Sequence, residues 1–269
     1  MKKVRSLLPL ISIFIVFILV SCNKKEGCTD ANALNFDPDA QIDNGCIYEE
    51  SFAVELHMHQ YMLDEQLITG GTYNINGVQT KLTVSQFYIS NIRLVDANDN
   101  ETAAAGFYLL INPEQEEYSI GNFPAGDYTK IKFNVGVDSA TNHGDPSLYA
   151  IGDPLGAQIP FMHWSWSFGY IFLRIDGEAD VNGDGITDNP DGLFEMHLGT
   201  ESYLASIEVD LPVTIGATNE NICHLATHWD MFFAGVDVAT DNTTHATDNE
   251  DLADILFGNI FTMFSEEIE

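Results

Sequence analysis

Basic residues are scarce in this 269-residue sequence: Lys and Arg number 10 against 41 Asp and Glu, and the formal net charge is −31. So acidic a chain repels nucleic acids and anionic lipid surfaces, and its summed field attracts cations. The composition therefore excludes a nucleic-acid-binding protein and favours a cation as partner. Solvation in salty surroundings is the alternative explanation for the same charge.

Long hydrophobic runs are lacking beyond the N-terminus. The apolar run Leu7–Val20 is shorter than the roughly 20 residues of a transmembrane helix, follows a short basic segment and precedes Ser21-Cys22. This layout is typical of a bacterial lipoprotein signal. We expect residues 1–21 to be removed and Cys22 to carry lipid, which would be the chain's only attachment to an outer membrane, on its periplasmic or cell-surface face. An uncleaved anchor or a plain secretory signal is the alternative.

Cysteines are few, and apart from Cys22 only three remain. Cys28 and Cys46 bracket a short polar segment in an oxidising compartment, so we expect them to form a disulfide. Residues 22–50 then form a disulfide-stapled acidic spacer that resembles a cysteine-bracketed motif of exported Bacteroidetes proteins. Cys223 is left over; it is interpreted as a buried free thiol, with metal ligation beside His224 as the alternative.

The pattern from Ser51 onward has a period of two, which is typical of half-buried strands. Only the end looks helical: 248–264 starts with acidic residues and places Leu252, Ile255, Leu256, Ile260 and Phe264 on one stripe. Residues 51–269 are therefore predicted to form an all-β domain, a two-sheet antiparallel β-sandwich with a short C-terminal helix. The expected strands include 52–58, 81–95, 107–111, 129–137, 169–175, 193–198 and 203–213.

One acidic loop has the spacing of a calcium-binding loop, with oxygen-bearing side chains at positions 1, 3, 5, 9 and 12 and Gly185 at position 6. A backbone carbonyl at position 7 would add another oxygen ligand. The alternative is an acidic hairpin turn, because the twelfth residue is Asp rather than Glu and no helix flanks the loop. The predicted calcium ligands are Asp180, Asn182, Asp184, Ile186, Asp188 and Asp191.

Histidines occupy paired positions. His57 and His59 lie two residues apart and share a strand face, and His224 and His228 share a face in a strand or a helix, so each pair could reach one metal ion. His163, His197 and His245 stand singly, and a lone histidine on a strand is more often solvated or hydrogen-bonded.

Two of the three tryptophans, Trp164 and Trp166, fall on one face of an extended segment, with His163 on the other. Core packing is the favoured explanation for their position, and a sugar-stacking platform is the alternative. The sequence has no phosphate-binding Gly-rich loop, nucleophile elbow or haem-attachment motif, so we expect no enzyme.

Several short motifs, in a fixed order over most of residues 52–265, resemble the MbnP-like family of exported copper-binding proteins. Short motifs in a shared order are far more specific than any one of them. They are Phe87–Leu94, Pro124–Tyr128, Phe133–Ser139 with Asn142, Asp153-Pro154, Met162–Trp166, Gly169–Phe172 and Met196–Gly199.

The resemblance implies a β-sandwich that binds copper through histidines and a kynurenine, which a di-haem peroxidase-like partner makes from a tryptophan. It also implies exchange with outer-membrane proteins of copper uptake or handling. His197 in its His-Leu-Gly setting carries over most directly, and either Trp164 or Trp166 is the candidate for oxidation. The candidate copper ligands are His57, His59, His163, His197 and His228.

Three functions therefore compete. The leading one is a copper-binding lipoprotein that is not an enzyme. The second is a calcium-stabilised adhesion or glycan-binding module in which Trp164, Trp166 and Trp229 stack on sugar. The third is a redox-active oxidoreductase, for which no second redox centre or substrate pocket is visible in the sequence.

Overall fold

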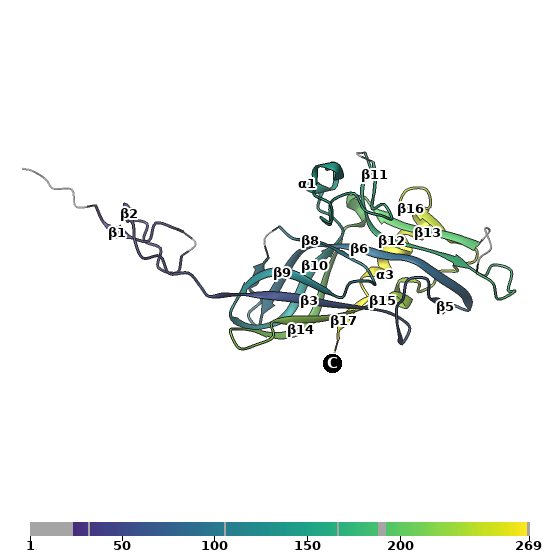
Figure 1. Ribbon diagram of the computed structural model, residues 1–269, viewed down its shortest axis with the longest axis horizontal. Helices are drawn as coiled ribbons and strands as arrows, with labels where there is room; N and C mark the ends of the chain where they lie inside the picture. Colours follow the sequence, from purple (N-terminus) through teal and green to yellow (C-terminus); the bar gives the residue numbers. More distant parts are fainter. Residues whose placement is uncertain (1–23, 32, 105, 166, 188–191, 268–269) are drawn as a thin grey trace, which may run out of the picture. The chain divides into compact units, whose positions relative to one another are not determined.

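The structure, a computed structural model, describes residues 24–267 except 32, 105, 166 and 188–191 (Figure 1). Contacts divide the chain into two compact units, Met1–Glu49 and Glu50–Glu269. In the part that the structure describes, no helix combines the length and the apolar character needed to cross a membrane.

The second unit contains a ten-stranded sheet whose long central strand, β6 (Val78–Asp96), pairs with five others. Four strands lie along one path with it, in the order β14 (Ala205–Ile215), β10 (Gly126–Val135), β6, β12 (Gly169–Ala179) and β13 (Leu193–Gly199), and β16 (Thr243–His245) adds an edge. Shorter strands pair beside this path: β5 (Thr72–Ile75), β7 (Glu101–Ala103) and β8 (Tyr108–Ile111) on β6, and β11 (His163–Ser165) on β12.

A five-stranded sheet faces the first one. Its order is β17 (Phe264–Glu266), β15 (Ile222–His228), β3 (Ser51–Met62) and β4 (Glu65–Gln66), with β9 (Glu117–Pro124) also paired to β3. The predicted all-β sandwich is confirmed. Two pairings in the sandwich differ from the antiparallel expectation, because β15 runs parallel to β3 and β16 parallel to β13. Long connections join both pairs, and only a tight hairpin forces neighbouring strands to be antiparallel.

One hydrophobic core fills the space between the sheets. Phe87 of β6 contacts Trp229 and Phe264, with ring centroids 6.0 and 5.7 Å apart. Trp229 is fully buried, and its Nε1 donates to Gln60 Oε1 at 2.7 Å. These edge-to-face contacts join strands of both sheets and fix how the sheets face each other.

A second buried cluster covers the outer face of the large sheet. It contains Tyr88, Tyr170 and Phe172, while Leu155 and Met162 come from the segment between β10 and β12. That segment also carries α1 (Ser139–Asn142) and a 3₁₀ turn, Pro146–Leu148. Because both faces of β12 are covered, the strand is buried almost throughout, and its first part, 169–173, is apolar without alternation.

The C-terminal helix is shorter than its hydrophobic stripe predicts. Helix α3 spans Glu250–Ile260, and the Asn249 side chain caps it by accepting from the Leu252 amide at 3.3 Å. It packs beside β13 and β16, with α2 (Trp229–Phe232) also in contact (Figure 1). Phe264 belongs instead to β17, and Ile255 is 45% exposed. The hydrophobic stripe predicts too long a helix, because Phe264 packs against the same core from strand β17.

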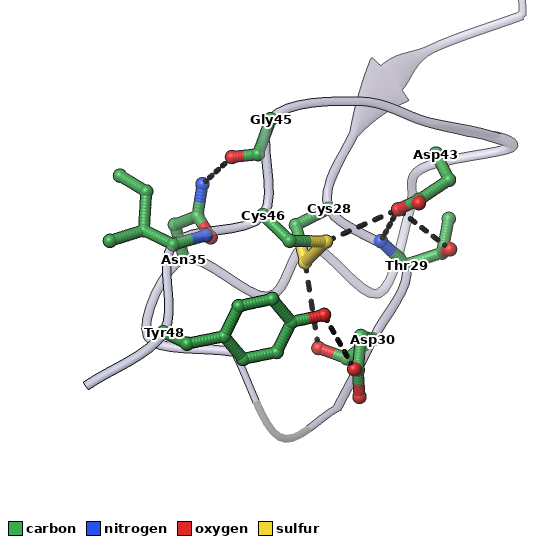
Figure 2. Close-up of a disulfide and its surroundings, with 9 residues drawn as sticks. Cys28, Thr29, Asp30, Asn35, Asp43, Gly45, Cys46 and Tyr48 are labelled. Atoms are coloured by element: carbon green, nitrogen blue, oxygen red, sulfur yellow. Dashed lines mark hydrogen bonds between the residues drawn. A yellow bond between two sulfur atoms is a disulfide. The ribbon is translucent and has the colours of Figure 1, made fainter. Parts of the chain in front are cut away.

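In the first unit the expected disulfide joins Cys28 to Cys46 (Figure 2). Two-residue strands, β1 (Glu26–Gly27) and β2 (Ile42–Asp43), pair in parallel around it. The Asn35 side chain donates to the Gly45 carbonyl at 2.7 Å and accepts from the Ile47 amide at 2.8 Å. Side-chain hydrogen bonds and the disulfide thus hold a segment with little core of its own.

Candidate metal centre

Two histidines far apart in sequence meet at the edge of the large sheet. His197 on β13 and His245 on β16 are directly opposed in the parallel register, because these two strands pair side by side. Their ring centroids lie 4.9 Å apart in an edge-to-face arrangement. The His197 side chain is 1% exposed and that of His245 is 36% exposed. His197 therefore lies in the interior and His245 at the surface.

A buried ion pair holds His197. Arg174 on β12 donates to Asp176 Oδ2 from Nε at 2.8 Å and from Nη2 at 2.5 Å, and His197 Nε2 lies 2.7 Å from Asp176 Oδ1. Burial alone would raise the pKa of Asp176, but the hydrogen bonds from His197 and Arg174 outweigh burial and lower that pKa below its ordinary 3.8. Asp176 is therefore a carboxylate at neutral pH.

The Asp176 carboxylate determines which nitrogen of the His197 imidazole donates a hydrogen bond. Because ionised Asp176 only accepts hydrogen bonds, Nε2 of His197 is the donor, and in the neutral imidazole this leaves a lone pair on Nδ1. That Nδ1 is buried and has no hydrogen-bond partner. Metal-binding histidines are held in this way, with one ring nitrogen on a carboxylate and the other on the ion. The donor set therefore fits a metal ligand at His197.

His245 supplies the second imidazole of the centre. Its Nδ1 lies 2.7 Å from Asp248 Oδ2, and its Nε2 lies 3.4 Å from Glu195 Oε2. One carboxyl oxygen of Glu195, one of Asp176 and one nitrogen of His197 also lie within 4.8 Å of one another. Carboxylates thus surround both imidazoles, which favours a cation between them.

Trp164 on β11 packs beside this pair. Its ring centroid lies 6.5 Å from that of His197, and its Nε1 is buried without a hydrogen-bond partner. Gly199 makes room for the indole, because a Cβ at this position would lie 2.6 Å from Trp164 Cζ3 and 2.7 Å from the Tyr170 carbonyl oxygen. In the His-Leu-Gly motif, the histidine offers a nitrogen and the glycine seats the indole.

Gly199→Ala should therefore displace Trp164 from His197 and lower the free energy of unfolding by about 1–3 kcal/mol, the usual cost of overpacking. Chemical denaturation followed by tryptophan fluorescence measures both effects. Gly258→Ala is the matched control, since nothing lies within 4 Å of its added Cβ in helix α3. That control should raise the free energy of unfolding by about 0.5–1 kcal/mol. Equal stability of the two variants would contradict the packing role of Gly199.

An open pocket of about 290 Å³ borders the centre on its exposed side. Trp164, Phe168 and His245 line it together with Thr247 and Asp248. Because His197 lies behind His245, this pocket is the approach from solvent to the centre.

Comparisons with known proteins identify the family and the fold. The MbnP family model matches residues 51–248, most of the chain. The chain belongs to the MbnP family. MbnP from Methylosinus trichosporium is structurally similar, with a TM-score of 0.50 and 16% sequence identity over 71% of this chain and 80% of that one. A comparison with curated proteins finds no match.

The MbnP-family sandwich separates the histidines that the sequence offers as copper candidates. His197 lies on the ten-stranded sheet, whereas His57, His59 and His228 lie on the five-stranded sheet. His163 on β11 packs edge-to-face against Tyr170 with ring centroids 4.8 Å apart, and burial lowers its pKa. The five candidates therefore do not surround one point.

His245 is the residue that sequence reasoning missed. It stands alone in a polar segment, and only the three-residue strand β16 brings it to His197. Among the tryptophans, Trp229 is fully buried and cannot stack on an exposed sugar. Trp166 and the expected lipidation site Cys22 lie outside the described residues.

Cys223 is a free thiol, fully buried, and burial raises its pKa to about 12. It is therefore protonated at neutral pH, when a metal ligand would need to be a thiolate. This matches its interpretation as a buried free cysteine.

The acidic loop after β12 folds around its own side chains. Asp180 accepts from the amides of Gly183, Asp184 and Gly185 at 2.8–3.1 Å, and Asp184 accepts from the Ile186 amide at 2.9 Å. The loop is thus already curved around the first predicted calcium ligands. Asp188 and Asp191 lie outside the described residues.

Proposed function

We propose that this MbnP-family protein binds copper at His197 and His245 and acquires or carries it at the bacterial envelope. One observation supports this most: the buried Nδ1 of His197 has no partner, while Asp176 holds the opposite nitrogen. Imidazole nitrogen is a preferred ligand of copper, and family membership favours a metal-related role. Copper in this proposal is the cargo, and the protein is a carrier rather than an enzyme.

Trp164 is our candidate for the third ligand. Oxidative opening of its indole, followed by hydrolytic loss of the formyl group, would turn the ring nitrogen into an aromatic amine, and Nε1 is the buried atom without a partner beside His197. The oxidation would need a separate enzyme, and a di-haem peroxidase-like partner is the one that the family resemblance implies. This assignment prefers Trp164 over Trp166.

The cellular setting is part of the same proposal. A lipid on Cys22 would tether the chain to the outer membrane, and residues 22–50, with their disulfide, would act as its spacer. Proteins of copper uptake or handling would then exchange the ion through the pocket beside His245. We propose calcium, the second metal, as the ion that orders the loop starting at Asp180.

Metal analysis and peptide mass spectrometry of the protein purified from its native host test the assignment. We expect about one copper ion per chain, calcium in addition, and a kynurenine mass shift at Trp164. A competition titration with a copper chelator should show that His197→Ala with His245→Ala abolishes tight binding, because no imidazole then remains at the centre.

The double variant His57→Ala with His59→Ala is the matched comparison, since it removes a histidine pair from the other sheet. It should bind copper as the wild type does. Copper binding that survives loss of His197 and His245 but disappears with His57 and His59 would move the centre to the five-stranded sheet and overturn the proposal.

A further inference from the structure

A second group of metal-ligating side chains lies on the five-stranded sheet, on the face turned away from the core. His57 on β3 is the register partner of Glu117 on β9 and of His224 on β15. Three adjacent strands thus place a carboxylate and two imidazoles in one row. Glu55 is two residues before His57 on β3 and so projects from the same face.

The donor atoms of three of these side chains converge. One oxygen of Glu55, one of Glu117 and one nitrogen of His57 all lie within 4.8 Å of one another. The ring of His224 packs edge-to-face on that of His57, with centroids 5.0 Å apart. Cross-strand register therefore brings His57 beside Glu117 and His224, and the two-residue spacing along β3 adds Glu55.

The His57 ring nitrogen Nε2 is shielded from solvent and has no hydrogen-bond partner. Glu55 Oε2 lies 3.8 Å away, which is too far for a hydrogen bond. A buried polar atom left without a partner costs free energy, so native proteins nearly always provide one. A bound cation would be that partner.

His59, the next histidine on the same face, differs from His57 in its partners. His59 Nδ1 is hydrogen-bonded to Glu267 Oε2, and His59 Nε2 lies 3.3 Å from Glu116 Oε2. Tyr61, the next residue on this face, also donates to Glu267, at 2.5 Å. Both nitrogens of His59 thus face carboxylates, as those of His245 also do, whereas Nε2 of His57 has no hydrogen-bond partner.

We propose that Glu55, His57 and Glu117 form a further metal site, which takes a divalent cation with the preferences of zinc. Zinc accepts imidazole nitrogen and carboxylate oxygen together, whereas calcium takes oxygen ligands only. Bonds of about 2.0–2.2 Å require the donors to close in slightly. The Glu55 side chain, 55% exposed, is free to rotate for this movement. His224 of β15 packs on the His57 ring but is not one of these three converging donors.

The site is independent of the copper centre, because its ligands come from β3 and β9 of the other sheet. An ion held by both strands would fasten β9 to β3 from outside the core. Binding to the folded state alone would then raise the melting temperature with zinc concentration.

Zinc titration of the purified protein carrying His197→Ala and His245→Ala tests the proposal, since zinc cannot then report on the other centre. Competition with a zinc-sensitive dye should show one site, and adding His57→Ala should weaken zinc binding about 100-fold or more. Glu117→Gln is a second variant that keeps side-chain size and should also weaken it. His143→Ala is the control, since it removes an exposed histidine paired with Glu201.

Circular dichroism identifies a variant that has simply failed to fold, and Glu117→Gln then decides the question. Zinc binding that is absent from the parent, or that His57→Ala and Glu117→Gln leave unchanged, would overturn the proposal. Loss of copper binding in the parent together with retained zinc binding would support two separate sites.

Discussion

Replacing Asp176 with asparagine should lower the free energy of unfolding by about 3–5 kcal/mol, the cost of breaking a buried ion pair, and weaken copper binding about 10- to 100-fold. The Arg174 side chain is only 7% exposed, so its charge would stay buried without a carboxylate. An amide also has no charge with which to fix the proton on Nε2 of His197. One substitution thus removes a structural pair and the orientation of a metal ligand.

Chemical denaturation and a copper titration of the same preparation measure the two effects. Glu208→Gln is the control, because Glu208 pairs with Lys130 and Lys132 but is 44% exposed. Exposed pairs of this kind contribute about 1 kcal/mol or less. If Asp176→Asn were as harmless as Glu208→Gln, the buried pair would not hold the centre.

The free energy of unfolding should depend on pH through the ionisation of Asp176, the partner of Arg174. Because the folded protein lowers the pKa of Asp176 below 3.8, its ionisation stabilises the fold fully at neutral pH. That contribution should be lost in acid, as the pH falls through the lowered pKa. Asp176→Asn should lack this part of the acid transition, which denaturation curves at several pH values would show.

Reduction of the disulfide should unfold the first unit and leave the sandwich intact. Cys28 and Cys46 are separated by 18 residues, and a loop of that size contributes about 3 kcal/mol through restriction of the unfolded chain. Among the described residues of this unit, Cys28 and Ala33 are its buried hydrophobic side chains. Packing of that extent cannot replace the lost restriction.

Hydrogen exchange of the oxidised and reduced protein measures this, with Cys28→Ser plus Cys46→Ser as the genetic equivalent. Amides of the first unit should exchange freely after reduction, whereas those of β6 and β12 should keep their protection. The sandwich is the internal control, because its free Cys223 forms no disulfide. Protection that persists in the reduced first unit would show that hydrogen bonds such as those of Asn35 suffice.

Much of the fold could be predicted because a strand buried on one face alternates apolar and polar residues in the sequence. The alternation through β3 predicts both the strand and the shared face of His57 and His59. The helix end could not be predicted in the same way, because Phe264 fits a helical stripe and yet belongs to β17. Periodicity records that a side chain is buried but not which element carries it.

The residues of the candidate site could likewise be predicted only in part. His197 and Trp164 lie in motifs and were candidates from sequence, whereas His245 depends on a parallel pairing with a distant strand. Local sequence carries no signal for such a pairing. The role of Gly199 was equally hidden, since the space it leaves for Trp164 exists only once β11 and β13 are assembled.

The unequal exposure of the two imidazoles gives the proposed copper centre a direction. On the proposed function, a protein that takes the ion must first displace His245, the ligand at the surface, while buried His197 still holds the metal. Handover would then proceed through an intermediate shared by donor and acceptor, with no free copper in solution. The rate of release would depend on the outer histidine, and the retention of the ion on the inner one.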